Sequence, residues 1–516
     1  RAWTATGSRP RLPPRNSLPL LLMVAHRHLP DGVLRSVASK NIVEFFGYHL
    51  RTGSAGGADT HALSRPTERI DYFLSHSWRD SGLLKYLALC WYFNSNLAVG
   101  SALTVGFLLA VYQRVFEVVL WPTCKFMNFP FTFAKGLGQV GIEFQIDPTS
   151  YWADPSHVLL NSNICQFFGM LTFVLVLLTG HLFRKSSGFF LDKICINQTD
   201  QKRKLAGIQA IDQFILRSKT MLICYNDDYF ERLWCTFELG ARAASGGDMV
   251  LLPLLRAPAV LAITVFMTLA HTFEYCGDYY LHNHVFPWQS LPPPPPATPF
   301  FRMPWQQPAA AATTALEGYD HNLITGILSF AFNFVPVWIF VAVTGIATEQ
   351  KLHFMDQLKG FSVAKTKCFA PSDRPIVEGA IANWFRKDRS ESDADAIGRF
   401  EHEVRDGRVA EQLYEAAGRQ AGLLRPYDLW MAFLVPWWMT AADLGSMAPC
   451  GWDETNALYL ATAPYVGFVT GAMLTAKLTE KFVTLVCYGT EHWLPARLFL
   501  SFLAVIFYFM ASGIGN

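Results

Sequence analysis

The chain has 516 residues, of which 51% are hydrophobic, 14% aromatic and only 16% charged. This composition excludes a disordered chain, a collagen and a basic nucleic-acid-binding protein. Soluble domains carry roughly 25% charged residues, so the low charged fraction favours an integral membrane protein with a sizeable soluble part. The formal net charge of +2 favours no particular partner, and ten cysteines without a CxxC pair indicate neither a disulfide scaffold nor a zinc ribbon.

The N-terminal segment is basic. Residues 1–30 contain five arginines, and no acidic residue precedes Asp31. This is the composition of an organelle transit peptide, and it is equally that of a disordered basic tail. We therefore expect residues 1–68 to form an N-terminal tail, with targeting and disorder both open as interpretations.

Short apolar runs alternate with helical patterns in two parts of the chain. Arg69–Ser77 (RIDYFLSHS) has the pattern of a strand that enters a loop, and the apolar helix Ser81–Phe93 follows it. Asn226 and Asp227 are the expected N-caps of a later helix. Strands and helices at these lengths predict an α/β unit with a parallel sheet. The later elements are the strands Phe189–Ile196, Thr220–Tyr225 and Met249–Leu255, and the helices Lys202–Arg217 and Tyr229–Ala244.

Long apolar runs surround these elements. A helix needs roughly 20 apolar residues to cross a bilayer core of about 30 Å. We predict a polytopic α-helical membrane protein with about seven spans, and the alternative for each weaker run is a buried helix of a soluble core. The stronger runs are Ile164–Phe183, Ala257–Phe273, His321–Ala347 and Leu494–Ala511, and the weaker ones are Leu97–Gln113, Leu429–Met447 and Ala457–Leu478.

Lysine and arginine are distributed unevenly between the runs. Residues 184–256 and 351–426 are rich in them, whereas residues 114–163 and 276–320 hold few. Because basic residues near short spans mark the cytoplasmic side, we expect the first two segments to face the cytosol. Within 351–426, apolar residues recur at helical spacing, which predicts an amphipathic helix. They are Ile397, Phe400, Val404, Val409, Leu413 and Ala417.

Three blocks of sequence carry a family resemblance. RIDYFLSHSWRD (69–80), FFLDKICINQTD (189–200) and LRSKTMLICYNDDYFERLWCTFEL (216–239) together resemble a toll/interleukin-1 receptor (TIR) domain. The resemblance implies a flavodoxin-like parallel sheet. The chain departs from the family where Leu97–Gln113 and Ile164–Phe183 replace one soluble loop, so we expect a membrane hairpin to interrupt the domain. It also departs from the family in the loop Asn197–Lys204, which lacks the Pro-Gly pair common in receptor TIR domains and used there for receptor contacts.

The resemblance sets the predicted organisation. The two parts of the TIR-like domain are separated by an inserted hairpin with a non-cytosolic loop, and further spans surround a charged cytosolic helical segment. In order, the segments are the tail (1–68), the first domain part (69–96), the inserted transmembrane hairpin (97–183), the second domain part (184–256), a transmembrane pair with a Pro-rich non-cytosolic loop (257–347), the charged segment (348–426) and C-terminal transmembrane helices (427–516).

The resemblance also points to a site. In TIR domains that hydrolyse NAD, the glutamate of the W-C-x-x-E-L pattern is catalytic, and Glu238 falls on that position. Trp234 lies four residues earlier on the same helix face, where an indole in a partly dry cleft raises the pKa of a carboxyl. Ser75, Ser77 and Asp192 are expected to line the same cleft. The sequence contains no usual nucleotide-binding loop and indicates no metal or resident cofactor, so NAD enters only as a substrate.

Several functions remain open at this stage. The first is a membrane-anchored signalling or scaffold protein that acts through association of TIR-like domains. The alternatives are an NAD hydrolase that uses Glu238, and an accessory subunit of a large membrane complex or a transporter. The expected partners are the lipid bilayer, a second copy, and other TIR-like domains or membrane subunits, with no nucleic acid. The expected location is multi-pass in a membrane, with the domain in the cytosol, or in the stroma or matrix if the N-terminus is a transit peptide.

Overall fold

The computed structural model describes residues 32–52, 56–116, 122–124, 160–162, 164–280, 339–368, 370–388 and 390–417, with single residues at 30, 428, 434, 435 and 481. The chain divides into two compact units. Unit 1 comprises Arg1–Leu89, His181–Leu254 and His353–Arg419, and unit 2 comprises Cys90–Gly180, Leu255–Leu352 and Gln420–Asn516. Unit 1 is therefore assembled from three stretches that alternate along the chain with those of unit 2.

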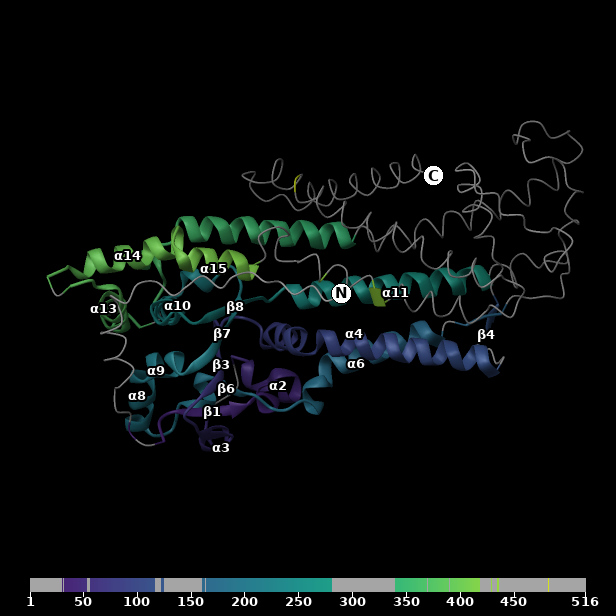
Figure 1. Ribbon diagram of the computed structural model, residues 1–516, viewed down its shortest axis with the longest axis horizontal. Coiled ribbons are helices and arrows are strands. Elements are labelled where there is room, and N and C mark those ends of the chain that lie inside the picture. The colour runs from purple at the N-terminus through teal and green to yellow at the C-terminus, as the bar shows by residue number, and fades with distance from the viewer. Residues whose placement is uncertain are drawn as a thin grey trace, which may run out of the picture. The chain divides into compact units, whose positions relative to one another are not determined.

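A six-stranded mixed sheet lies at the centre of unit 1, in the order β2-β1-β6-β3-β7-β8 (Figure 1). Strands β6, β3, β7 and β8 are parallel, and β1 is antiparallel to both β2 and β6. The parallel strands follow the order second, first, third, fourth, as in flavodoxin-like doubly wound sheets. The bounds are β1 (Arg35–Ala38), β2 (Ser64–Pro66), β3 (Ile70–Ser75), β6 (Gly188–Phe190), β7 (Ser218–Tyr225) and β8 (Asp248–Pro253).

The central strands are apolar because both of their faces are covered. The last five residues of β7, Met221 to Tyr225, are buried, as are the last three of β3. The Phe73 ring stacks on Phe190 of the neighbouring strand at 4.8 Å between centroids, and Phe190 contacts Phe214 at 4.2 Å. These aromatic contacts join the sheet to the helix that precedes β7.

The helices between the strands differ in detail from the predicted ones. The single helix predicted over Lys202–Arg217 is two helices, α8 (Gln201–Gln209) and α9 (Ile211–Leu216), which break at Ala210. The predicted N-caps Asn226 and Asp227 are wrong for α10 (Leu233–Ser245), whose N-cap is Arg232. Asn226 instead accepts a hydrogen bond from the Asp228 amide, because its side chain closes the turn before η5 (Tyr229–Glu231).

The segment before β3 belongs partly to the sheet. The prediction that residues 1–68 form a tail is wrong from residue 35 onward, where the chain forms helices and strands. That stretch forms β1, α2 (Ser39–Gly47), η2 (Tyr48–Leu50), α3 (Ala58–Ala62) and β2. Val37 is fully buried, and Arg35 Nε donates to Ser64 Oγ at 2.8 Å across the β1–β2 pair. Residues 1–29, on which the targeting hypothesis rests, lie outside the described part.

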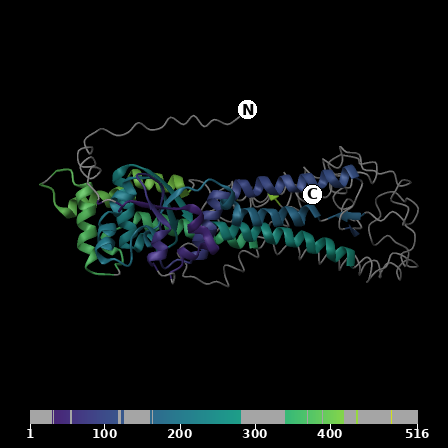
Figure 2. The same ribbon diagram turned by 90° about the horizontal axis from the view of Figure 1, so that it is seen from below.

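The charged segment after residue 352 covers one side of unit 1. Helices α13 (Asp373–Phe385), α14 (Asp393–Arg405) and α15 (Arg408–Ala417) pack on α10 and β8 (Figure 1). In the view from below, the green of this segment lies beside the teal part of unit 1 (Figure 2). The predicted apolar face is confirmed at Phe400, Val404, Val409 and Leu413, which are buried, although it runs over two helices. This segment is thus part of the same compact unit as the sheet.

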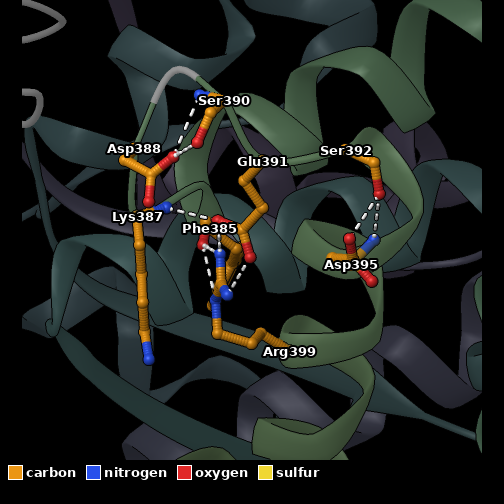
Figure 3. A network of polar contacts seen from close by, with 8 residues as sticks. All are labelled: Phe385, Lys387, Asp388, Ser390, Glu391, Ser392, Asp395 and Arg399. Atoms are coloured by element: carbon orange, nitrogen blue, oxygen red, sulfur yellow. Dashed lines mark hydrogen bonds and ion pairs between the residues drawn. The ribbon is translucent and has the colours of Figure 1, made fainter.

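A polar network fixes the turn between α13 and α14 (Figure 3). Arg399 donates two hydrogen bonds to the Glu391 carboxylate and two to the Phe385 carbonyl, at 2.9 and 2.7 Å for the latter pair. This guanidinium lowers the pKa of Glu391 to about 2. Ser392 caps α14 by accepting from the Asp395 amide at 3.2 Å.

Two helical segments are long and apolar enough to cross a membrane. They are Gly82–Tyr112, within α4 (Gly82–Phe116), and Ile164–Phe183, formed by α6 (Ile164–Thr179) and η4 (Gly180–Phe183). The second segment has the predicted bounds. The first begins 15 residues before the predicted run Leu97–Gln113, because the predicted helix Ser81–Phe93 and that run form one continuous helix. Of the other predicted spans, Ala257–Phe273 lies in α11 (Arg256–Tyr280), which contributes a shorter apolar stretch, and His321–Ala347 is described only from residue 339. The three C-terminal runs lie outside the described residues, apart from single positions.

A buried arginine joins α10 to the sheet. The Arg242 guanidinium donates to the carbonyls of Ile215, Ser218, Lys219 and Asp248, and the side chain is 2% exposed. A Cβ at Gly247 would lie 2.2 Å from the Arg242 Cζ, so this position requires glycine. Arg242 therefore satisfies main-chain acceptors at the starts of both β7 and β8.

We expect Arg242→Met to lower the free energy of unfolding of unit 1 by about 3 kcal/mol or more, because several buried carbonyls lose a charged donor. Thermal unfolding of the full chain in detergent measures the change. Arg203→Met is the matched control, since that side chain is 75% exposed and forms a surface ion pair with Asp200. Equal unfolding temperatures for the two variants would contradict the assignment.

Candidate functional site

The site lies at the carboxyl ends of β3, β6 and β7. In open α/β sheets, ligands bind outside the carboxyl ends of the strands, at the point where the strand order reverses. Here that point is the β3–β7 pair, because β6 lies on one side of β3 while β7 and β8 lie on the other. Ser75 ends β3, Asp192 follows β6, and Asn226 follows β7.

Two of the predicted residues meet directly. The Ser75 Oγ donates to Glu238 Oε2 at 2.5 Å, although 163 residues separate them in the chain. The Tyr229 hydroxyl lies 2.6 Å from the same Oγ. Either hydroxyl can be the donor in this second hydrogen bond. Ser75 and Tyr229 are fully buried, while Glu238 keeps part of its surface exposed.

Burial dominates the electrostatics of this cluster. It raises the pKa of Glu238 to about 8, an effect that the Ser75 hydrogen bond partly offsets and the charge of Asp192 reinforces. It also raises the pKa of Tyr229 well above its usual value. At neutral pH Glu238 is therefore mostly protonated, and a cation that enters the site would favour its ionised form.

Asp192 is held by an indole. Trp78 Nε1 donates to Asp192 Oδ2 at 2.9 Å, and the Lys193 amide donates to Oδ1 at 2.7 Å. The Lys193 ammonium lies 3.7 Å from the centre of the Trp78 ring, a cation–π contact, and also donates to the Arg51 carbonyl at 2.9 Å. Burial raises the pKa of Asp192. These hydrogen bonds hold Asp192, one of the residues predicted to line the cleft, directly after β6.

The loop after β3 adds further polar groups. Ser77 Oγ accepts from Arg232 at 3.1 Å, and Asp80 accepts from Asn226. The other Asp80 oxygen and His76 Nε2 are buried without a hydrogen-bond partner among the described residues. Burial raises the pKa of Asp80 to about 6 and lowers that of His76 well below its usual value, so His76 is neutral.

Trp234 is directed elsewhere. Its indole Nε1 donates to Asp373 of α13 at 3.1 Å, and its ring contacts Phe237 at 5.4 Å. Helical spacing places Trp234 one turn from Glu238, but the carboxyl is hydrogen-bonded to Ser75, on the sheet side. Trp234 thus joins α10 to α13 of the charged segment.

The sequence interpretation missed Trp78, Tyr229 and Arg232 as site residues. All three lie within the blocks that carry the family resemblance, so their positions were visible although their contacts were not. In the part of the chain that the structure describes, no group of three or more histidine, cysteine, aspartate or glutamate side chains could hold a metal ion.

The chain was compared with protein-family models, with curated proteins and with solved structures, and none of the three comparisons finds a match.

The raised pKa of Glu238 predicts a pH-dependent stability. The pKa of this glutamate is about 4.5 in the unfolded chain and about 8 in the native state. Between these two pH values, the native state retains a proton that the unfolded chain has released. The free energy of unfolding therefore falls as pH rises through this window, by at most about 1.4 kcal/mol per pH unit for this group.

We expect Glu238→Gln to remove this slope, so that the variant gains stability relative to the wild type as pH increases. Unfolding of the full chain in detergent, measured between about pH 5 and 8, tests the expectation. Glu378→Gln, on α13, is the control and should retain the wild-type slope. Identical profiles for Glu238→Gln and the wild type would be the contrary result.

Proposed function

We propose that unit 1 is a membrane-attached TIR-like domain that hydrolyses the bond between nicotinamide and ribose in NAD. The observation that carries the proposal is the 2.5 Å contact between Ser75 and Glu238 at the β3–β7 edge. It puts the residue on the family's catalytic position into a partly exposed site with a second carboxyl, a neutral imidazole and an indole nearby. From sequence alone, association of domains ranked first, and this cluster is the reason to prefer the hydrolase.

The chemistry assigned to these residues is electrostatic. As the C1′–N bond breaks, its electron pair leaves with neutral nicotinamide, and positive charge develops on the ribose. The carboxylate of Glu238 stabilises that charge while water adds to C1′ and releases a proton to solvent. The pyridinium of NAD favours the ionised form of Glu238 on binding. Ser75, held by Tyr229, fixes the direction of the carboxylate.

The membrane arrangement follows from the chain order of the units. The three stretches of unit 1 form one compact body and so share one compartment. Each intervening stretch, 90–180 and 255–352, must therefore cross a bilayer an even number of times. The two helices Gly82–Tyr112 and Ile164–Phe183 suit the first of these stretches as one hairpin. We propose a multi-pass protein with unit 1 in the cytosol, on the basic side of the spans.

Nicotinamide release by the purified full chain tests the activity. We expect Glu238→Gln to lower kcat by about 10²–10³, because one well-placed charge is lost from the site. Glu378→Gln, which removes a carboxylate ion-paired with Arg374 on α13, should leave kcat unchanged. The value of kcat/KM should rise with pH toward about 8, as Glu238 ionises in the free protein.

Two outcomes would contradict this function. Absence of release by the wild type, with the protein concentrated enough to self-associate, would reject the hydrolase and favour a signalling or scaffold role through domain association. Release that survives Glu238→Gln would show that the activity depends on another residue.

The topology has its own test. Cys124 lies between the two helices of the proposed hairpin, and Cys368 lies in unit 1, so they should be on opposite sides of the membrane. A membrane-impermeant maleimide applied to intact cells should label Cys124 and spare Cys368, with peptide masses and Cys124→Ala and Cys368→Ala variants assigning the label. Equal labelling or equal protection of both cysteines would overturn the arrangement.

A further inference from the structure

A corner of unit 1 exposes aromatic side chains on a strained backbone. Helix α2 is interrupted near its end, where Phe45 and Phe46 have φ of 48° and 54°. Their side chains are 74% and 59% exposed, and Tyr48 in η2 is 47% exposed. Left-handed backbone is strained at bulky residues, and exposed rings forgo the benefit of burial. Contact of these rings with an apolar environment would provide that benefit.

This corner lies against the first turn of α4. A Cβ at Gly47 would lie 2.8 Å from the Tyr86 Cβ, and the rings of Phe46 and Tyr86 are 5.8 Å apart. Gly82, the first residue of α4, contacts Arg51 just after η2. Figure 1 shows α2 near the N-terminal turns of α4. The exposed aromatics are therefore adjacent to the start of a helix that is apolar enough to cross a membrane.

The end of η4 also exposes apolar and basic side chains. Cys90 and Asn94 of α4 hydrogen-bond to the carbonyls of Leu178 and Leu177. Leu182 and Phe183, 63% and 80% exposed, follow at the end of η4, just after Gly180, where a Cβ would lie 3.2 Å from Asn94 Cγ. Exposed Arg184 and Lys185 come directly after them. Exposed apolar rings followed by basic residues form the pattern of a bilayer interface that contains anionic lipids.

The length of α4 supports a position of the Phe46 corner at the level of the lipid headgroups. Gly82–Tyr112 has 31 residues, which at 1.5 Å per residue is about 46 Å, whereas the hydrocarbon core is about 30 Å thick. About ten residues of this helix therefore exceed the hydrocarbon thickness. The first eight, residues 82–89, belong to unit 1, which fits a position of the Phe46 corner in the headgroup region.

We propose that Phe45, Phe46, Tyr48, Leu182 and Phe183 form an interfacial collar that inserts into the boundary between lipid headgroups and acyl chains. The occupant of this surface is the bilayer that α4 enters, so the inference rests on the proposed membrane location but not on the hydrolase activity. The basic residues Arg184 and Lys185 contact anionic headgroups at its rim. The collar attaches the sheet-containing unit to the membrane surface at a second place besides the helices.

A photo-crosslinker at position 45 tests the collar in the full chain. The protein is reconstituted into nanodiscs of equal parts phosphatidylcholine and phosphatidylglycerol, with p-benzoylphenylalanine replacing Phe45, Phe107 or Ile376 in separate variants. Phe107 is 54% exposed within α4 and serves as the membrane-embedded control. Ile376 is 69% exposed on α13 and is the matched apolar control away from the collar. Mass analysis after irradiation detects lipid adducts.

We expect lipid adducts at positions 45 and 107 and none at position 376. Adducts at 107 without adducts at 45 would overturn the collar while keeping the membrane location. Crosslinks from 45 to a second copy would likewise overturn it, in favour of a protein partner. Absence of adducts at 107 would reject the membrane location and the collar together, and nicotinamide release remains an independent readout of the proposed hydrolase.

Discussion

The parallel pairing of β3 with β7 is the constraint on which the rest of unit 1 depends. It runs in register from Ile70 opposite Ser218 to Ser75 opposite Ile223, between strands from two separate stretches of the chain. Only this pairing brings the end of β3 beside the chain that leaves β7, and therefore Ser75 beside Glu238. The fold tolerates the long stretch between β3 and β6 because both of its ends are fixed in the sheet. For example, Asp71 of β3 accepts a hydrogen bond from the Gly188 amide of β6 at 2.7 Å.

Local sequence was sufficient for the elements that are buried on both faces. The run Arg69–Ser77 predicts β3, whose observed bounds lie within it, and β7 and β8 differ from prediction by one or two residues. Strand β6 is shorter than predicted because Asp192–Cys195 turns into helix. The strand β1 and the edge strand β2 were not predictable, since RSVA and SRP contain no apolar run and owe their conformation to pairing.

The site likewise contains residues that the sequence could predict and one that it could not. Ser75, Asp192 and Glu238 could be proposed from the three sequence blocks, because each lies next to an element whose type the sequence predicts. Trp234 could not be placed, since the helix face it occupies is covered by α13, which follows in the chain only after residue 372. Periodicity gives the spacing of side chains on a helix but not which neighbour will cover each face.

The assembly of unit 1 from three stretches has a consequence for synthesis of the protein. Translation delivers residues at about 5–20 per second, so roughly 8–30 s pass between the emergence of Ser75 and that of Glu238, 163 residues later. During that interval β3 has neither of its parallel neighbours and presents two unpaired edges beside an apolar helix. The nascent chain must therefore be kept from pairing with other chains until β6 and β7 arrive, and α10 stays uncovered until α13–α15 have been made.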